Sequence, residues 1–123
     1  MTTRVVALVP DLLFGSQVQG ALRAGGLEVE LVGSAERARA HLPEAGVLVV
    51  DLTSPDVDGP ALVRELAGAG ALAGVRTLGF YAHIDPEVRQ RALDAGFDQV
   101  VPRSRMAREG AELVRRLLSP GDR

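Results

Sequence analysis

The sequence predicts an α/β domain built on a five-stranded parallel sheet with helices on both of its faces. Short apolar runs alternate along the chain with stretches in which apolar residues recur at helical spacing. One of these runs, Val47–Val50, contains four consecutive aliphatic residues, which is typical of a strand buried on both faces of a parallel sheet. Parallel strands are joined by right-handed helical crossovers, so strict alternation of strands and helices favours this architecture.

The first half of the chain holds three of the expected strands. Val5–Val9 is a short apolar run that ends at a proline. In Leu27–Val32, apolar and charged residues alternate, as is typical of a strand near the edge of a sheet with one face toward solvent. The helix between them is expected over Leu12–Ala24, because an apolar stripe at helical spacing is followed by two glycines. Ser34 is a favourable N-cap for a short second helix, and Val47–Asp51 is the central strand. The stripe of the first helix consists of Phe14, Val18, Ala21 and Leu22.

The second half continues the same alternation. A proline suited to a first helical turn opens a helix over Pro60–Ala67, and Val75–Phe80 is the fourth strand. The helix over Pro86–Ala95 follows an aspartate that can cap it and ends at a glycine. Gln99–Val101 is a short fifth strand, and a last amphipathic helix is expected over Ser104–Leu118.

Composition limits the class of protein. A chain of 123 residues that is 46% hydrophobic has room for one core, so we expect a single domain over residues 1–119 and a short tail at 120–123. The absence of cysteine excludes disulfides and thiolate chemistry. A formal charge of -2 and an isoelectric point near 5.6 argue against nucleic-acid or membrane binding. No apolar run approaches the roughly 18 residues of a membrane span, and we expect a cytoplasmic domain.

Four polar side chains are expected where strands end, at the carboxyl edge of the sheet that holds ligands in open α/β folds. An acidic pocket with a cation beside it can bind a divalent ion and accept a phosphoryl group. The alternative is that the acid at the end of the central strand only caps a turn or the following helix. The four residues are Asp11, Asp51, Tyr81 and Arg103.

The segment Asp51–Gly59, which follows four aliphatic residues, resembles the phospho-acceptor segment of response-regulator receiver domains. Tyr81-Ala82-His83 is similar to the Thr/Ser-Ala segment after the fourth strand of that family. Asp94–Asp98 is similar to its Ala-Gly-Ala-Asp turn, and Val101–Ser104 stands where the family has Lys-Pro. The resemblance covers nearly the whole chain. It implies a flavodoxin-like doubly wound fold with strand order 2-1-3-4-5.

The resemblance also implies roles for individual residues. Asp51 stands where the family accepts phosphate from a histidine kinase, and the carbonyl of Thr53 stands where it helps to hold Mg²⁺. Tyr81 and Arg103 occupy the switch positions at which the family has a small hydroxyl residue and a lysine. His83 lies in the loop on the pocket side, and the sequence leaves its role open.

The chain departs from the family at the acidic pair after the first strand. The helix stripe places Val9 and Pro10 at the two acidic positions. A shift by one residue would bring Asp11 to the second position, but that shift turns Gly15 and Arg23 toward the core, which periodicity disfavours. We therefore expect at most weak Mg²⁺ binding, with Asp51, the Thr53 carbonyl and Asp11 as its ligands, and no other cofactor.

These departures lead to a specific hypothesis about the pocket: Arg103 pairs with Asp51, and Tyr81 covers the pair. The sequence therefore favours a stand-alone atypical receiver that acts by protein–protein contacts, is phosphorylated weakly or not at all, and is not an enzyme. One alternative is a competent receiver that accepts phosphate on Asp51. Another is a small flavodoxin-like enzyme or ligand-binding domain, which bound flavin or nucleotide after purification would favour. The expected partner is a histidine kinase, another signalling protein or a second copy, docked on the helices over Pro86–Ala95 and Met106–Leu118.

Overall fold

The computed structural model describes residues 4–82 and 85–119 and has the expected architecture, a five-stranded parallel sheet in the order β2-β1-β3-β4-β5. His83 and the expected tail at 120–123 lie outside the described residues. The strands are β1 (Arg4–Leu8), β2 (Glu28–Val32), β3 (Val47–Asp51), β4 (Arg76–Tyr81) and β5 (Gln99–Pro102). The helices are α1 (Leu12–Ala24), α2 (Ala35–His41), α3 (Gly59–Gly68), α4 (Pro86–Ala95) and α5 (Arg103–Leu118), with a 3₁₀ turn η1 over Leu42–Glu44.

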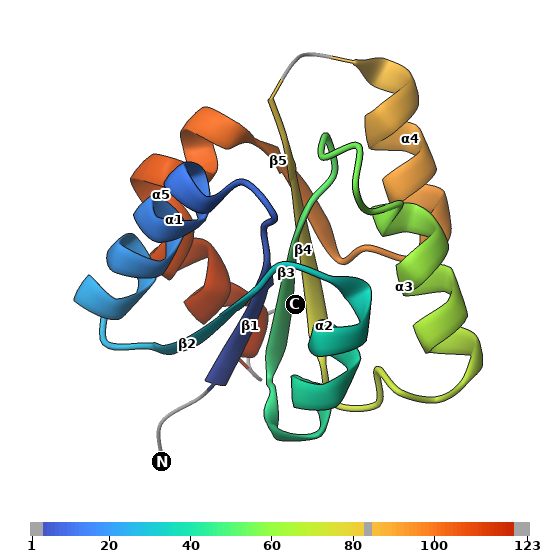
Figure 1. Cartoon of the computed structure of the whole chain (residues 1–123), viewed down its shortest axis with the longest axis horizontal. Coiled ribbons are helices and arrows are strands. Elements are labelled where there is room, and N and C mark those ends of the chain that lie inside the picture. The colour runs from blue at the N-terminus through green and yellow to red at the C-terminus, as the bar shows by residue number, and fades with distance from the viewer. Residues whose placement is uncertain (1–3, 83–84, 120–123) are drawn as a thin grey trace.

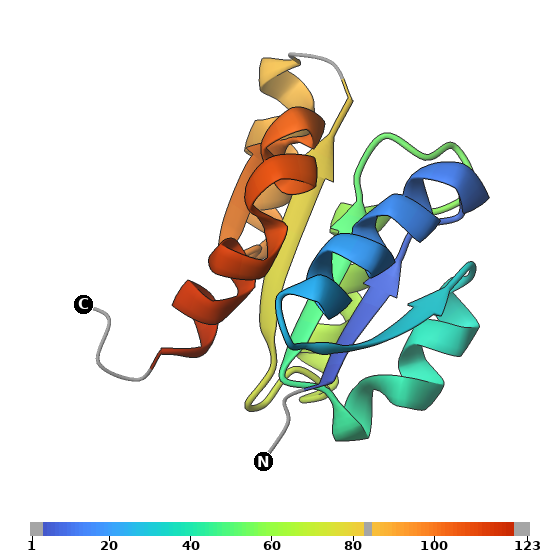
Figure 2. The same ribbon diagram turned by 90° about the vertical axis from the view of Figure 1, so that its left-hand side faces the viewer.

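Helices cover both faces of the sheet. In Figure 1, α1 and α5 lie on one side of the strands, and α2, α3 and α4 lie on the other. The quarter-turn in Figure 2 shows α1 and α5 packed beside each other in front of the sheet. Two separate apolar clusters fill the two interfaces, one on the α1–α5 face and one on the α2–α3–α4 face. None of the described helices has the length and apolar character that crossing a bilayer requires.

The central strand β3 organises this arrangement. All five of its residues are buried, and it pairs in parallel with β1 on one side and β4 on the other. Val47 and Val49 pack into the α1–α5 face, while Leu48 and Val50 pack into the opposite face. A strand buried on both faces has no polar alternation, which is why the unbroken aliphatic run identified it correctly.

Several element ends differ from the expected ones by a residue or two. Helix α1, strand β3 and helix α4 begin and end where the sequence predicted, whereas β4 runs one residue further, to Tyr81. Helix α2 ends at His41, before Pro43. The chain continues in the 3₁₀ turn, where Pro43 takes an early position that needs no N–H donor.

Aspartate and serine side chains define the starts of four helices. The side chains of Asp11, Ser34, Asp58 and Asp85 accept hydrogen bonds from backbone N–H groups in the first turns of α1, α2, α3 and α4. Helix α5 begins after Pro102 without a side-chain cap. The Asp-Gly pair that closes the motif after β3 is therefore a helix start.

The sequence periodicity was wrong about Gly15, which was expected to face away from the core. Gly15 is buried in α1, and a Cβ on it would lie 3.1 Å from Leu31 Cδ1 and 3.2 Å from the carbonyl oxygen of Val9. The missing side chain lets α1 approach β1 and β2 closely. A hydrophobic pattern cannot detect this contact, because glycine contributes no apolar side chain to the stripe.

Two further glycines make room for Leu52, the residue that follows β3. A Cβ on Gly79 would lie 2.8 Å from Leu52 Cδ1 and 3.2 Å from Phe97 Cδ2. A Cβ on Gly59 would lie 3.0 Å from Leu52 Cδ2. Since Leu52 is held between these two backbones, it has little room to move away from an added methyl group.

We predict that Gly79→Ala lowers the free energy of unfolding by about 1 to 3 kcal/mol, because the added methyl group overpacks the space that Leu52 fills. Gly20→Ala is the matched control, since Gly20 lies in α1 with nothing within 4 Å of an added Cβ. That substitution should raise stability by about 0.5 to 1 kcal/mol through helix propensity. Urea denaturation followed by circular dichroism measures both, and equal stability of the two variants would contradict the packing argument.

Candidate functional site

A shallow pocket of about 330 Å³ opens at the carboxyl edge of the sheet. Segments that are distant in the sequence meet there: the loop after β1, the loop after β3, the residue after β4 and the first residue of α5. The structure therefore brings together Asp11, Asp51, Thr53 and Arg103, as expected from strand ends in a parallel sheet. The lining residues are Pro10, Asp11, Asp51, Thr53, Ser54, Pro55, Asp56, Ala82 and Arg103.

Asp51 is the last residue of β3, and its exposed fraction is 5%. Its Oδ1 atom accepts two hydrogen bonds from Thr53, one from the backbone N–H at 2.9 Å and one from the hydroxyl at 2.8 Å. Asp51 thus caps its own turn, as the alternative interpretation of the sequence proposed for the acid at the end of the central strand. Its Oδ2 atom accepts no hydrogen bond from the described residues and is not sealed from solvent. One carboxylate oxygen of this pocket-lining residue is structural, and the other has no donor among the described residues.

Asp11 is engaged on both of its carboxylate oxygens. Its Oδ1 accepts the N–H groups of Leu13 at 3.0 Å and Phe14 at 3.2 Å, and its Oδ2 lies 3.4 Å from an NH2 nitrogen of Arg103. The hydrogen bond from Phe14 is the main cause that lowers the pKa of Asp11 below its usual value of 3.8. Partial desolvation opposes this shift, while the Leu13 N–H and the Arg103 charge add to it. Asp11 is therefore committed to capping α1 and to holding Arg103.

Arg103 forms its ion pair with Asp11 and not with Asp51, so the expected Asp51–Arg103 pair is wrong. The reason lies in the aromatic residue beneath it. The guanidinium carbon of Arg103 lies 3.8 Å from the centroid of the Phe14 ring, a cation–π contact. Phe14 in turn packs against Phe80, with ring centroids 5.3 Å apart and planes inclined by 57°. This stack holds the guanidinium over α1, on the Asp11 side of the pocket.

Tyr81 does not line the pocket, so the expectation that it covers Asp51 is also wrong. Its side chain is buried in the cluster on the α2–α3–α4 face, whereas Phe80 faces the α1–α5 side. Successive side chains of a strand point to opposite faces, and this alternation sends the phenol away from the side on which Arg103 and Phe14 stack. His83, the other residue of this segment, lies outside the described residues.

The donor set does not fit a strong Mg²⁺ site. Mg²⁺ requires near-octahedral oxygen ligands, usually including carboxylates. Of the two positions where acids were sought, Val9 is buried in the core and Pro10 has no side-chain donor. Within residues 4–82 and 85–119, no three His, Cys, Asp or Glu side chains come close enough to share an ion. Asp11 could contribute only by releasing Arg103 and the start of α1.

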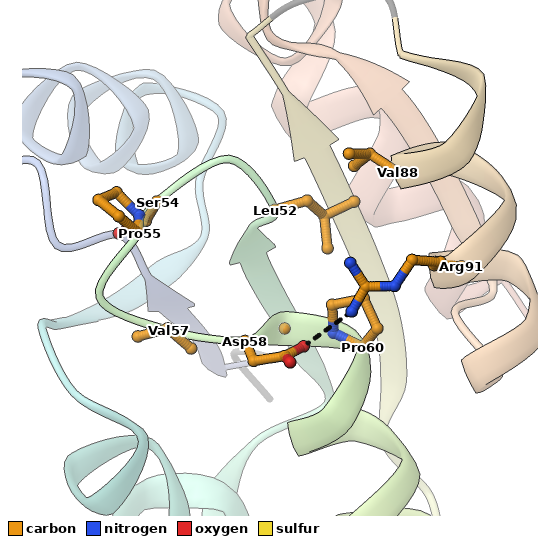
Figure 3. A pocket seen from close by; sticks show the side chains of 9 residues that line it. Leu52, Ser54, Pro55, Val57, Asp58, Pro60, Val88 and Arg91 are labelled. Atoms are coloured by element: carbon orange, nitrogen blue, oxygen red, sulfur yellow. Dashed lines mark ion pairs between the residues drawn. The ribbon is translucent and has the colours of Figure 1, made fainter.

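A second pocket, of about 240 Å³, lies between the β3–α3 loop and α4 (Figure 3). Arg91 of α4 reaches across it and forms an ion pair with Asp58 at 3.5 Å, and Leu52 and Val88 lie beside it. Asp58 also caps α3, so a single carboxylate joins the start of α3 to α4. Sequence reasoning missed Arg91, because no spacing along the chain relates it to Asp58.

The geometry can be set beside known proteins. No protein-family model matches the sequence, and no curated protein matches it. Solved structures do match, over almost the full chain. The chain has the receiver-domain fold.

Three of these structures illustrate the likeness. The signal receiver domain of the response regulator NarL from Mycobacterium tuberculosis is 26% identical, with 92% of this chain and 93% of that chain covered and a TM-score of 0.75. The chemotaxis response regulator CheY4 of Vibrio cholerae is 18% identical, with 96% and 100% covered and a TM-score of 0.84. HP1043, an orphan response regulator of H. pylori, is 14% identical, with 95% and 97% covered and a TM-score of 0.79.

These neighbours confirm the predicted fold class and strand order. In this chain, Asp11, Arg103 and Phe14 form a cluster beside Asp51. We refer to these three residues as the Arg103 clamp.

Substitutions at Asp11 test the clamp through stability and its pH dependence. Asparagine keeps an oxygen that can cap α1 but loses the charge facing Arg103, and alanine loses both. We predict melting temperatures at neutral pH in the order wild type, then Asp11→Asn, then Asp11→Ala. The folded-state pKa of Asp11 is lowered, so its charge stabilises the fold above the unfolded pKa and ceases to do so as the pH falls through the folded pKa.

The difference between wild type and Asp11→Asn should therefore close as the pH is lowered below the usual value of 3.8. Thermal unfolding followed by circular dichroism at a series of pH values measures this difference. A gap that stays constant into the acid range would show that the charge of Asp11 does not contribute.

Proposed function

We propose that this protein is an atypical receiver, a signalling module that acts through protein–protein contacts and is phosphorylated weakly or not at all. The observation that carries the proposal is the ion pair between Arg103 and Asp11. These are the cation and the acid that stand nearest to the positions a receiver uses for its switch and its metal. In this chain each is engaged with the other and with α1, so neither is free to serve Asp51.

The charge of the pocket supports the same conclusion. Three aspartates and one arginine line it, a formal charge of -2. Transfer of a phosphoryl group to Asp51 would add negative charge, which phosphoryl-transfer sites offset with a metal ion and free cations. The described donors suit no strong metal site, and Arg103 already faces Asp11. The uncompensated charge would disfavour the acyl phosphate.

A second candidate function is favoured by one specific observation. Asp51 is held at the end of a buried strand and lines the pocket, and its Oδ2 accepts no hydrogen bond from the described residues. That is the placement a phospho-acceptor needs, and it keeps the competent receiver as the alternative. The two functions differ in whether a phosphate donor modifies Asp51.

The partner in this proposal is a histidine kinase, another signalling protein or a second copy, and α4 and α5 are the surface we assign to its contact. Helix α4 buries only Ala92 and Ala95 among its residues, so most of its surface is available to a partner. Helix α5 carries Arg105, Arg108 and Arg116 on its exposed side, each paired with a glutamate of the same helix. Exposed ion pairs of this kind add little to stability and can be exchanged for contacts with another chain.

Incubation with acetyl phosphate and Mg²⁺, followed by intact-mass analysis, tests the proposal. We expect no stoichiometric gain of a phosphoryl group on the wild-type protein, because the described residues offer no strong Mg²⁺ site from which an ion would offset the added charge. Asp51→Asn is the control for specificity. A stoichiometric gain that disappears in Asp51→Asn would establish the competent receiver instead.

Restoring an acid should restore metal binding. Pro10 lines the pocket beside Asp11, and Pro10→Asp would add a carboxylate there. We predict that this variant binds Mg²⁺ about tenfold more tightly than wild type in a calorimetric titration, since a second free carboxylate supplies the missing ligand. Pro10→Asn, which adds a neutral side chain of the same shape, should not. Equal affinity of all three proteins would show that the missing acid is not what limits the site.

A further inference from the structure

The carboxylate of Asp51 combines deep burial with an unused acceptor. Its exposed fraction is 5%, yet only Oδ1 accepts hydrogen bonds, and Oδ2 has no donor among the described residues. Oδ2 is thus the acceptor of this carboxylate that remains for a donor entering the pocket. The pocket that Asp51 lines has room for a side chain from outside.

The charges around the pocket select the kind of group that fits. Asp56 lines the same pocket and is exposed, while Arg103 is held by Asp11 and Phe14. The formal charge of -2 favours a cation and disfavours an anion. The described carboxylates are too few and too far apart to coordinate a metal ion together. An ammonium or guanidinium group needs no such coordination, because its several N–H donors can divide between Asp51 and Asp56.

The rim of the pocket adds an apolar element. Leu12 and Leu13, the first two residues of α1, have exposed fractions of 78% and 75%, and they directly follow Asp11. They are the large hydrophobic residues that stand out as exposed in the described part of the chain. Paired exposed leucines beside a pocket are unlike the scattered apolar residues of an ordinary surface and suit contact with another protein.

We propose that a partner protein docks here by inserting one basic side chain toward Asp51 and covering Leu12 and Leu13 with flanking apolar residues. Arginine and lysine suit this arrangement because their long aliphatic stems pack on apolar surface while the charged head reaches a polar group beyond it. In the partner segment, a basic residue therefore stands between apolar residues. This inference rests on the proposed function, in which Asp51 is phosphorylated weakly or not at all, and it adds a contact surface to the one assigned to α4 and α5.

A short peptide probes the site directly. The labelled protein is titrated with acetyl-Leu-Arg-Leu-amide, and backbone amide resonances are followed by ¹H–¹⁵N NMR. Saturable shifts are expected at Thr53, whose N–H is bonded to Asp51, and at Leu12 and Leu13. The matched peptide has citrulline, a neutral isostere, in place of arginine, and it should bind about tenfold more weakly because the charged hydrogen bond is lost.

Variants separate the two parts of the surface. Asp51→Asn should weaken the arginine peptide about tenfold while keeping the acceptor for Thr53, whereas Glu36→Gln removes a charge on α2 and should change nothing. Leu12→Ser combined with Leu13→Ser should weaken both peptides, and the double methionine variant should retain binding. All of these residues except Asp51 are on the surface, so the fold should survive.

Equal affinity for the arginine and citrulline peptides, shifts confined to other surfaces, or no shifts would overturn the inference. Saturation of the Thr53 shift by Mg²⁺ alone, with displacement of the peptide, would assign the site to a metal and overturn it as well. The phosphate-donor experiment is independent of these results. Phosphorylation of Asp51 would remove the proposed function, whereas a failure of peptide binding without phosphorylation would remove only this docking site.

Discussion

The burial of β3 on both faces is the constraint on which the rest of the molecule depends. Its four aliphatic residues fill both apolar clusters, so the strand must occupy the middle of the sheet with a neighbour on each side. Helices must then cover both faces, since either face left open would expose a continuous apolar surface. The same constraint places Asp51 at the carboxyl edge of the sheet. There it is buried, and it is hydrogen-bonded to the turn that follows the strand.

At that edge, the position of Arg103 follows from competition between acceptors. Asp51 already has two donors from Thr53 on one oxygen, whereas Asp11 lies beside an aromatic ring on which the guanidinium can rest. A cation–π contact at a partly exposed site contributes about 0.5 to 1 kcal/mol. The guanidinium of Arg103 forms its ion pair with Asp11 while it stays on the Phe14 ring. Reaching Asp51 would sacrifice both contacts. The pocket chemistry of this chain thus depends on Phe14, a residue of the core.

The fold and the membership of the pocket were open to prediction from the sequence, but the contacts within the pocket were not. Asp51, Asp11 and Arg103 were placed together correctly because parallel strands all end at one edge. The partner of Arg103 and the direction of Tyr81 were predicted wrongly. The first depends on a stack of two phenylalanines from α1 and β4, and the second on which face of β4 the phenol takes. Gly15 was misjudged because close backbone approach leaves no mark in a hydrophobic pattern.

By itself, the sequence determined the order of the elements, the buried strand and the helix caps at Ser34 and Asp85, because these depend on periodicity and on side chains bonded to their own neighbours. Only the tertiary structure decided that Arg103 faces Asp11 and that Arg91 reaches Asp58. Each of these contacts joins segments whose separation along the chain is unrelated to their distance in space. Their geometry is set by packing against third residues, and a linear pattern does not encode that packing.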